Sequence, residues 1–284
     1  MKYFFLFFLI IAQYTVAQST EPFQIYKKNG KKISTQKFLR SLELSDVVLF
    51  GELHDNPISH WLQLKAIQYL HSKHNITLGA EMLESHNQKQ LDAYLAGEIP
   101  QEELDSTAQL WVNYKTDYKP LVDFAKMNQL PFIATNIPRK YASYVYRNGL
   151  ESLEDELDEE EKALVAPLPI AYDPELPGYK SMLSMMSDHS TPNFPKAQAI
   201  KDATMAHFIY EHFKSTSSQF IHFNGDYHSK NFEGIYWYLK RKDESLNVLT
   251  ISTVEQENVK KLIEENNGLA DFIIVVDKDM TKTY

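Results

Sequence analysis

The sequence of 284 residues contains no cysteine. This absence excludes disulfide bonds, thiolate metal ligands, cysteine nucleophiles and the lipid-bearing cysteine of a bacterial lipoprotein. The folded protein must therefore be stabilised by its hydrophobic core. A chain of this length can bury a sizeable core, and it fits one large domain better than two.

An excess of positive charge and the common phosphate-binding loops are also missing. The formal net charge is −9, which argues against nucleic acid and anionic membranes as the main partners. The chain has no G-x-S-x-G elbow, no P-loop and no dinucleotide-binding fingerprint. These absences disfavour serine hydrolysis and phosphate binding through a glycine-rich loop.

Long hydrophobic runs are absent except at the N-terminus. Lys2 is followed by YFFLFFLIIA and then by small residues up to Ala17. A basic start, a short apolar core and a small-residue end predict a secretory signal peptide over residues 1–17. A retained membrane anchor is the alternative, although the run is short for a bilayer span. We therefore expect residues 18–284 to form a single exported domain without a transmembrane span, periplasmic or outer-membrane-associated in a bacterium.

Strand and helix patterns alternate along the rest of the chain. Helical spacing of apolar residues predicts helices that include residues 101–114, 197–213 and 255–265. This alternation predicts an α/β fold, a mainly parallel sheet of about six strands flanked by helices on both faces. The six short apolar runs that predict strands are residues 47–50, 76–80, 132–135, 220–223, 247–251 and 272–276.

Three segments depart from this alternation. Residues 23–34 predict a hairpin at the sheet edge, because Asn29-Gly30 is a favoured two-residue turn. Residues 151–162 are dominated by acids and predict a solvated helix face. Residues 167–195 are rich in proline and methionine, and they predict a helical, lid-like excursion from the sheet.

Two predicted strand ends carry the same Gly-acid-x-His pattern. Glu81 follows another strand, and Asn136 and Arg139 follow a fourth. Ligands of parallel sheets bind outside the carboxyl ends of the strands. We therefore expect the histidines of both patterns to share one pocket. The two patterns are Gly51-Glu52-Leu53-His54 and Gly225-Asp226-Tyr227-His228.

The residues at these strand ends are suited to metal binding. His54, His228 and Glu81 would supply the nitrogen and oxygen ligands of zinc, manganese or iron. A glutamate, Glu52 or Glu81, would then act as general base towards metal-bound water. The alternative is structural, since a histidine after a strand often only bonds to backbone. Arg139 has two interpretations, binding of a ligand carboxylate or a salt bridge to Glu81 or Glu52.

Glycines and other histidines complete the candidate residues. Gly51 and Gly225 would permit positive φ and close approach of the backbone where the chain turns. Asn136 and Asp226 are further candidates for binding a ligand. The remaining histidines share no pattern and are interpreted as structural or surface residues.

Taken together, several longer motifs resemble the ChaN-like haem-binding uptake family of the Tiki/TraB/erythromycin-esterase-like superfamily. They are GELHDNPISHWLQ, GAEM, TNIPRKYASYVYRNGL, AQAIKDATMAHFI and NGDYHSKNFEGI, spread over about residues 40–255. The resemblance implies an α/β fold, export, and a role in haem or iron acquisition with haem as cofactor. It also implies an outer-membrane uptake system as partner and leaves oligomerisation open. Other members of the superfamily are metal-dependent peptidases, so the alternative function is that of a metal-dependent hydrolase. The resemblance therefore leaves open whether the protein is an enzyme.

The resemblance also transfers site residues. Asp226 and Tyr227 depart from the small polar pair usual in the last motif, which predicts a more crowded pocket. For haem, the axial ligand would be a histidine or a tyrosine. Tyr172, Tyr179 and Met182 of the 167–195 excursion are the expected haem contacts. The matching positions are Gly51, Glu52, His54, Glu81, Asn136, Pro138, Arg139, Asp202, Met205, Ala206, Gly225 and His228.

Overall fold

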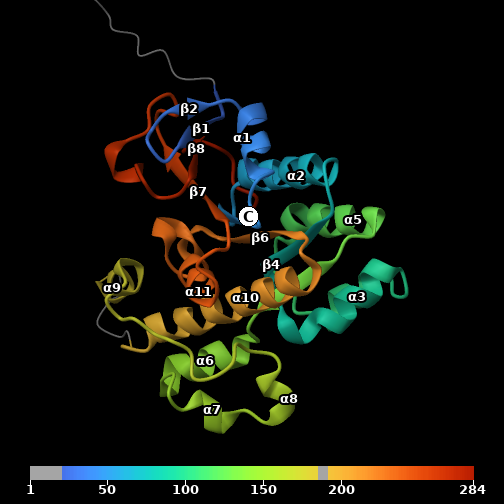
Figure 1. The fold of residues 1–284 in the computed structure, drawn as a ribbon. Coiled ribbons are helices and arrows are strands. Elements are labelled where there is room, and N and C mark those ends of the chain that lie inside the picture. The colour runs from blue at the N-terminus through green and yellow to red at the C-terminus, as the bar shows by residue number, and fades with distance from the viewer. Residues whose placement is uncertain (1–20, 185–190) are drawn as a thin grey trace, which may run out of the picture.

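The computed structural model describes residues 21–184 and 191–284, so the expected signal peptide lies outside the described residues. The described strands form one eight-stranded sheet in the order β2-β1-β8-β7-β3-β6-β4-β5 (Figure 1). The strands are β1 (Phe23–Lys27), β2 (Lys32–Ile33), β3 (Val47–Glu52), β4 (Ile76–Glu84), β5 (Phe132–Asn136), β6 (Gln219–Gly225), β7 (Val248–Gln256) and β8 (Phe272–Asp277).

The prediction of a mainly parallel sheet is confirmed. Strands β3 to β8 all pair in parallel. The six predicted strands are all present, and the predicted hairpin forms β1 and β2, which pair antiparallel at the edge next to β8. The carboxyl ends of β3, β6 and β4 therefore lie side by side at one edge of the sheet.

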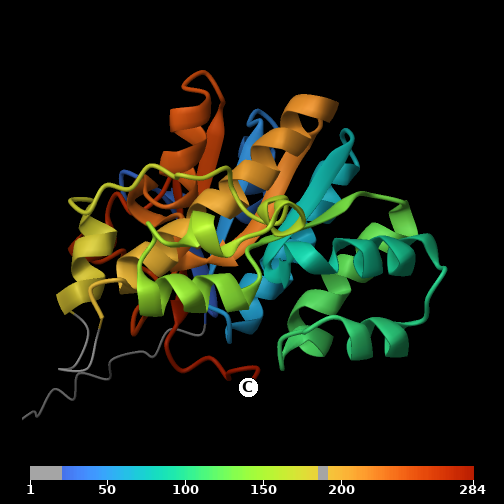
Figure 2. The same cartoon turned by 90° about the horizontal axis from the view of Figure 1, so that it is seen from below.

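Helices cover both faces of the sheet (Figures 1 and 2). They are α1 (Thr35–Leu42), α2 (Pro57–His71), α3 (Gln88–Ala96), α4 (Gln101–Thr107), α5 (Lys119–Asn128), α6 (Arg139–Asn148), α7 (Leu153–Glu156), α8 (Glu159–Lys162), α9 (Pro177–Ser184), α10 (Phe194–Thr216) and α11 (Ile235–Lys242), with shorter turns η1 (Ser85–Asn87), η2 (Tyr114–Tyr118), η3 (Asp226–His228), η4 (Lys230–Phe232) and η5 (Glu264–Asn266).

Strand β3 shows why these central runs are apolar throughout. Val48 and Phe50 pack against the helices α1, α2, α3 and α5 on one face. Val47 and Leu49 pack against α10 and α11 on the other face. Both faces are buried, and each fully buried side chain of this size contributes roughly 1.5–3 kcal/mol. Helix α6 packs on the outer side of α10 (Figure 2).

One predicted helix is wrong and another is shorter than predicted. Residues 255–265 do not form a helix, because β7 continues to Gln256 in register with β8 and a loop with the short turn η5 follows. The Gln256 side chain holds that loop by donating to the carbonyls of Asn258 and Lys261. The helix predicted over 101–114 ends at Thr107, and the chain then runs extended through residue 108 towards the site.

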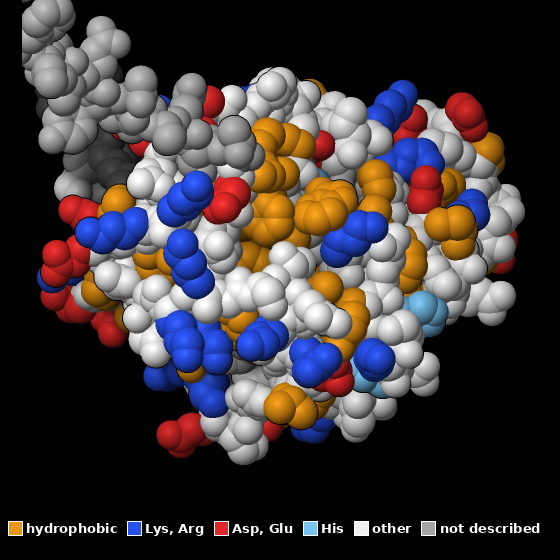
Figure 3. Space-filling view, turned by 90° about the horizontal axis from the view of Figure 1, so that it is seen from above, with side chains coloured by type: hydrophobic (Ala, Val, Ile, Leu, Met, Phe, Trp, Pro, Cys, Tyr) orange, Lys and Arg blue, Asp and Glu red, His pale blue; other side chains and the backbone are white. Residues whose placement is uncertain are grey.

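The surface is mixed in character. On the face in Figure 3, hydrophobic side chains lie between lysine and arginine side chains, although the net charge of the chain is −9. Among the helices of residues 21–184 and 191–284, none has the length and apolar character needed to cross a bilayer.

Candidate functional site

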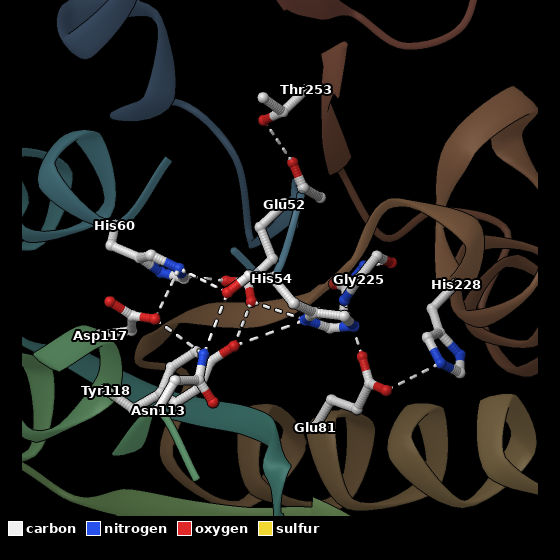
Figure 4. Close-up of polar contacts among 12 residues, drawn as sticks. Glu52, His54, His60, Glu81, Asn113, Asp117, Tyr118, Gly225, His228 and Thr253 are labelled. Atoms are coloured by element: carbon white, nitrogen blue, oxygen red, sulfur yellow. Dashed lines mark hydrogen bonds and ion pairs between the residues drawn. The ribbon is translucent and has the colours of Figure 1, made fainter. Parts of the chain in front are cut away.

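The two Gly-acid-x-His motifs meet at the carboxyl edge of the sheet. Strands β3 and β6 are neighbours, and Glu52 pairs in register with Gly225. A Cβ atom added to Gly225 would lie 2.7 Å from Nε2 of His54, so that ring packs directly on the β6 end. The backbone N–H of Gly225 donates to Oε2 of Glu81 at 2.7 Å, and Nε2 of His228 lies 3.0 Å from Oε1 of the same carboxylate (Figure 4).

Glu52 is the buried centre of the first half of the site. Its Oε1 lies 2.9 Å from Nδ1 of His54 and accepts a hydrogen bond from the Tyr118 hydroxyl at 2.6 Å. The Gln63 carboxamide donates to Oε2. Burial alone would raise the pKa of Glu52, but the hydrogen bond from His54 and the charge of His60 outweigh it and hold the pKa below its ordinary value. Glu52 is therefore a carboxylate at neutral pH.

His54 is anchored through its backbone as well as its ring. Its carbonyl accepts hydrogen bonds from Nε2 of His60 and Nδ2 of Asn113, each at 3.0 Å (Figure 4). Trp111 packs edge-on against the imidazole. Burial lowers the pKa of His54, but the hydrogen bond to Glu52 and the charge of Glu81 together raise it by more, so the net shift is upward. The imidazole side chain is 31% exposed, which leaves it accessible from the site.

His228 forms the second half of the site and is buried. Its Nδ1 lies 2.5 Å from Oδ1 of Asp202, while its Nε2 contacts Glu81. Tyr179 donates from its hydroxyl to the other oxygen of Asp202 at 2.9 Å. Burial opposes protonation of His228, but the charges of Glu81 and Asp202 outweigh it and raise its pKa to about 10. The ring is therefore an imidazolium ion between two carboxyl groups.

Both motif glycines are explained by close approach of the backbone. A Cβ on Gly51 would lie 2.5 Å from the carbonyl oxygen of Ile251 on β7, and the added Cβ on Gly225 would meet the His54 ring. Gly225 has φ −56°, which any residue can adopt. Positive φ, the other expected reason, is therefore not required at Gly225.

A cavity of about 780 Å³ opens over this edge of the sheet. This volume is within the range of roughly 300–1,000 Å³ typical of small-molecule sites. Its lining includes both motif histidines and the side chains of Met182, Phe194 and Tyr227. Tyr227 is 46% exposed, and the Lys230 ammonium group lies 3.4 Å from the centroid of its ring.

The last described residues fold back onto the site. The backbone N–H of Thr283 donates to the Asp55 carbonyl at 2.9 Å, and its hydroxyl donates to Asp117 at 2.8 Å. Lys282 pairs with Asp55 and with Glu255. Tyr284 then lines the cavity beside His54 (Figure 2 shows the C-terminus at this edge of the sheet).

Comparison with known proteins identifies the family of this chain. The model of the family described as "Haem-binding uptake, Tiki superfamily, ChaN" matches residues 38–239. The chain belongs to this haem-binding ChaN family. No curated protein matches it.

Solved structures share the ChaN-family fold of this chain. One, described as cofacial haem binding to ChaN of Campylobacter jejuni, has a TM-score of 0.64 at 19% identity and covers 91% of this chain and 98% of that chain. The type III effector HopBA1 has a TM-score of 0.50 at 12% identity and covers 86% of this chain and 93% of that chain. At these identities the likeness shows the fold alone.

Haem fits the cavity of this ChaN-family chain by its chemistry. Met182 and Phe194 offer apolar walls for a porphyrin, and the half-exposed Tyr227 lies in the same lining. Two expected haem contacts lie elsewhere. Tyr179 is buried with its hydroxyl on Asp202, Tyr172 stacks on it, and neither lines the cavity.

A metal ion fits the site less well. The expected ligands His54, His228 and Glu81 do come together, but they are engaged in ion pairs with each other and with Glu52 and Asp202. Within the described ranges 21–184 and 191–284, no group of three or more His, Cys, Asp or Glu side chains is arranged to hold a metal. A metal site here stays a prediction.

The remaining predicted residues take positions around the site. Asp226 accepts a hydrogen bond from the Ser252 hydroxyl at 2.5 Å. Asn136 donates to the Glu81 carbonyl at 2.9 Å. Among the described residues, the Arg139 side chain has no ion pair, so the alternative salt bridge to Glu81 or Glu52 is wrong. Its backbone N–H donates to Glu84 instead.

Sequence reasoning missed the side chains that support the two histidines. His60 was expected to be structural or at the surface, and it is buried against Glu52 and the His54 backbone. Gln63 follows three residues later on α2, so the helical spacing from the strand end could have indicated both. Tyr118 and Asn113 come from a segment with no motif, and no local signal identifies them.

Proposed function

We propose that this protein binds haem in the cavity at the carboxyl edge of its sheet, as part of haem or iron acquisition. The observation that carries this proposal is a cavity of about 780 Å³ that has apolar walls and the half-exposed Tyr227 in its lining. Membership of the haem-binding ChaN family supports it. Bound haem would supply an iron centre that takes an axial phenolate or imidazole ligand.

Tyr227 is the residue best placed to be the axial ligand. Tyr227 lines the cavity and is 46% exposed as a residue, and the Lys230 ammonium near its ring would offset the charge of a phenolate. His54 is less suited, because Nε2 packs against the Gly225 backbone and the raised pKa favours its protonated form. Lys230 also lines the cavity, where it would pair with a haem propionate.

Hemin titration of the purified apo-protein tests this proposal. We expect a saturable Soret shift with a defined stoichiometry. Tyr227→Phe should lower hemin affinity at least tenfold and change the spectrum of the ferric form. Tyr172→Phe is the matched control, because Tyr172 lies outside the cavity and should bind hemin like the wild type. A titration without a saturable Soret shift would contradict haem binding, and a wild-type spectrum for Tyr227→Phe would exclude Tyr227 as ligand.

A second candidate function is hydrolysis. The observation that favours it is the Glu52–His54 pair, because an accessible imidazole that a carboxylate keeps protonated is the arrangement of a general acid. In a metal-dependent form, the ion would be bound by His54, His228 and Glu81. His228 would then have to give up one of its ion pairs with a carboxylate and bind the metal instead. Elemental analysis, followed by peptidase and esterase assays with and without chelator, separates the two functions. His54→Ala should abolish hydrolysis while hemin affinity stays close to that of the wild type.

We further propose that the protein acts after export and delivers haem or iron to an outer-membrane uptake system. Support comes from the signal-peptide pattern of residues 1–17 and from the family. The intact mass of protein isolated from its native host tests the first step, because cleavage after Ala17 leaves a mature chain that begins at Gln18. A full-length mass in the cytoplasmic fraction would contradict export.

A further inference from the structure

A second cavity, of about 450 Å³, lies beside the first at the same edge of the sheet. We call it the Arg139 cavity, and it does not depend on haem binding. Tyr284 lines both cavities, whereas Glu81 lines only the Arg139 cavity of the two. The residues on which the argument depends are Trp111, Asn113, Asn136, Arg139, Lys201 and Tyr284.

Two cations in this cavity have no anionic partner among the residues that the structure describes. The side chains of Arg139 and Lys201 line the cavity from α6 and α10. Within the described part of the chain, neither side chain forms an ion pair or a side-chain hydrogen bond. Helix α6 begins at Arg139, so its positive end also faces this region. An anionic ligand would therefore meet two side-chain cations without an ion-pair partner, since the helix end itself already donates to Glu84.

Two buried carboxamides add unsatisfied acceptors. Asn136 is 8% exposed and Asn113 is 4% exposed, and both line the cavity. Asn136 donates its Nδ2 to the Glu81 carbonyl, and Asn113 donates its Nδ2 to His54 and Asp117. These bonds fix which end of each carboxamide is the oxygen. Neither Oδ1 atom has a hydrogen-bond partner among the described residues, and such buried acceptors are uncommon.

The acids of the cavity are already engaged. Glu81 accepts from Gly225 and pairs with His228, and Glu84 accepts from the backbone of Arg139 at 2.9 Å. They therefore do not neutralise Arg139 and Lys201. The unmatched groups are two cations and two acceptor oxygens, which calls for a ligand with negative charge and at least one donor.

We propose that the Arg139 cavity binds a small hydroxy acid with two carboxylates. The carboxylates pair with Arg139 and Lys201, since a planar guanidinium binds a carboxylate through two parallel hydrogen bonds. The hydroxyl group donates to the carboxamide oxygen of Asn136 or Asn113. Trp111 forms an apolar wall of the cavity. This pattern of groups distinguishes a hydroxy acid from a simple anion, which would leave both acceptors unmatched.

Calorimetric titration of the purified protein, without added haem, tests the proposal with three probes. Malate has two carboxylates and a hydroxyl, succinate lacks only the hydroxyl, and inorganic sulfate is a simple anion without a hydrogen-bond donor. We expect malate to bind saturably with one site per chain. Succinate should bind about tenfold more weakly, because the hydrogen bond to the carboxamide is lost. Equal binding of malate, succinate and sulfate would reduce the site to a general anion site and overturn the proposal.

Charge variants locate the binding. Arg139→Gln should weaken malate binding at least tenfold, and Lys201→Gln should weaken it several-fold. Lys140→Gln is the matched control, because Lys140 carries the same charge one residue along, pairs with Glu161 and does not line the Arg139 cavity. All three positions have exposed or half-buried side chains, so the variants should fold. If Lys140→Gln weakened malate binding as much as Arg139→Gln, the effect would be one of net charge and the proposed site would be wrong.

Discussion

The two Gly-acid-x-His strand ends use their acids differently. At the end of β3, Glu52 holds His54 two residues later in the same motif. At the end of β6, Asp226 turns away to Ser252 on β7, and His228 takes both its carboxyl partners from elsewhere. The same short pattern therefore produces a local pair in one place and a network between distant elements in the other.

The two histidines therefore have different roles: His54 faces the cavity, and His228 stabilises the fold. The His54 side chain is 31% exposed and lines the cavity of about 780 Å³, and its partner Glu52 comes from the strand that precedes it. His228 is buried and links β4 through Glu81 to α10 through Asp202. A strand-end motif determines where an imidazole lies, and its distant partners determine whether it stabilises the fold or faces a ligand.

The largest expected effect is on stability. His228→Ala should lower the free energy of unfolding by about 3–5 kcal/mol, because it leaves two buried carboxyl groups without their cation. His54→Ala should cost less, about 1–2 kcal/mol, because the buried Glu52 carboxylate keeps Tyr118, Gln63 and His60 as partners. Urea denaturation followed by circular dichroism measures both values. Similar losses for the two variants would contradict the distinction between the histidines.

The two motif glycines should differ in the same way, with a smaller effect. Gly51→Ala pushes a Cβ against the Ile251 backbone carbonyl at 2.5 Å, and the sheet cannot easily move, so we expect a loss of about 1–3 kcal/mol. Gly225→Ala meets the end of the His54 side chain, which can shift. Its stability should stay within about 1 kcal/mol of the wild type while the His54 ring signals move in NMR spectra. The reverse order of losses would show that the β6 end is the more rigid one.

The free energy of unfolding should also depend on pH through His228, and per pH unit this is the smallest of the expected effects. The pKa of His228 is about 10 in the folded protein against an ordinary value of 6.5. Between these values the unfolded chain releases a proton that the folded chain keeps. The contribution of His228 to the free energy of unfolding is therefore fully present below pH 6.5. It falls as the pH rises towards about 10, by up to about 1.4 kcal/mol per pH unit. Urea denaturation at several pH values should show this slope in the wild type and in His54→Gln, and its persistence in His228→Gln would assign it to another group.

The architecture could be predicted from sequence because the central strands carry their own signal. Val47 to Phe50 is apolar throughout since both faces of β3 are covered by helices. The Asn-Pro pair at residues 56 and 57 is a local signal of the same kind, and the Asn56 side chain does cap α2 by accepting from the backbone N–H groups of Ile58 and Ser59. The helix predicted over 255–265 failed because pairing of β7 with β8 extended the strand, and long-range pairing leaves no local pattern.

The site was predictable only in part for the same reason. His54, His228 and Glu81 follow strands, so their common edge could be inferred from the topology of parallel sheets. Tyr118 and Gln198 approach the histidines from a π-helix and from α10, and their contacts depend on how these elements pack. The phenol on the cavity, Tyr227, lay inside a predicted motif, yet only the fold shows that it faces the cavity while Tyr179 is buried.

The return of the chain to the site has a practical consequence for anyone who prepares this protein. Because Thr283 is bonded to Asp55 and Asp117, a purification tag attached after Tyr284 would begin next to a residue that lines both cavities. Such a tag, particularly one of histidines, would compete for hemin and shield Arg139. Protein without an addition after Tyr284 keeps its last residues bound to Asp55 and Asp117 and both cavities as described.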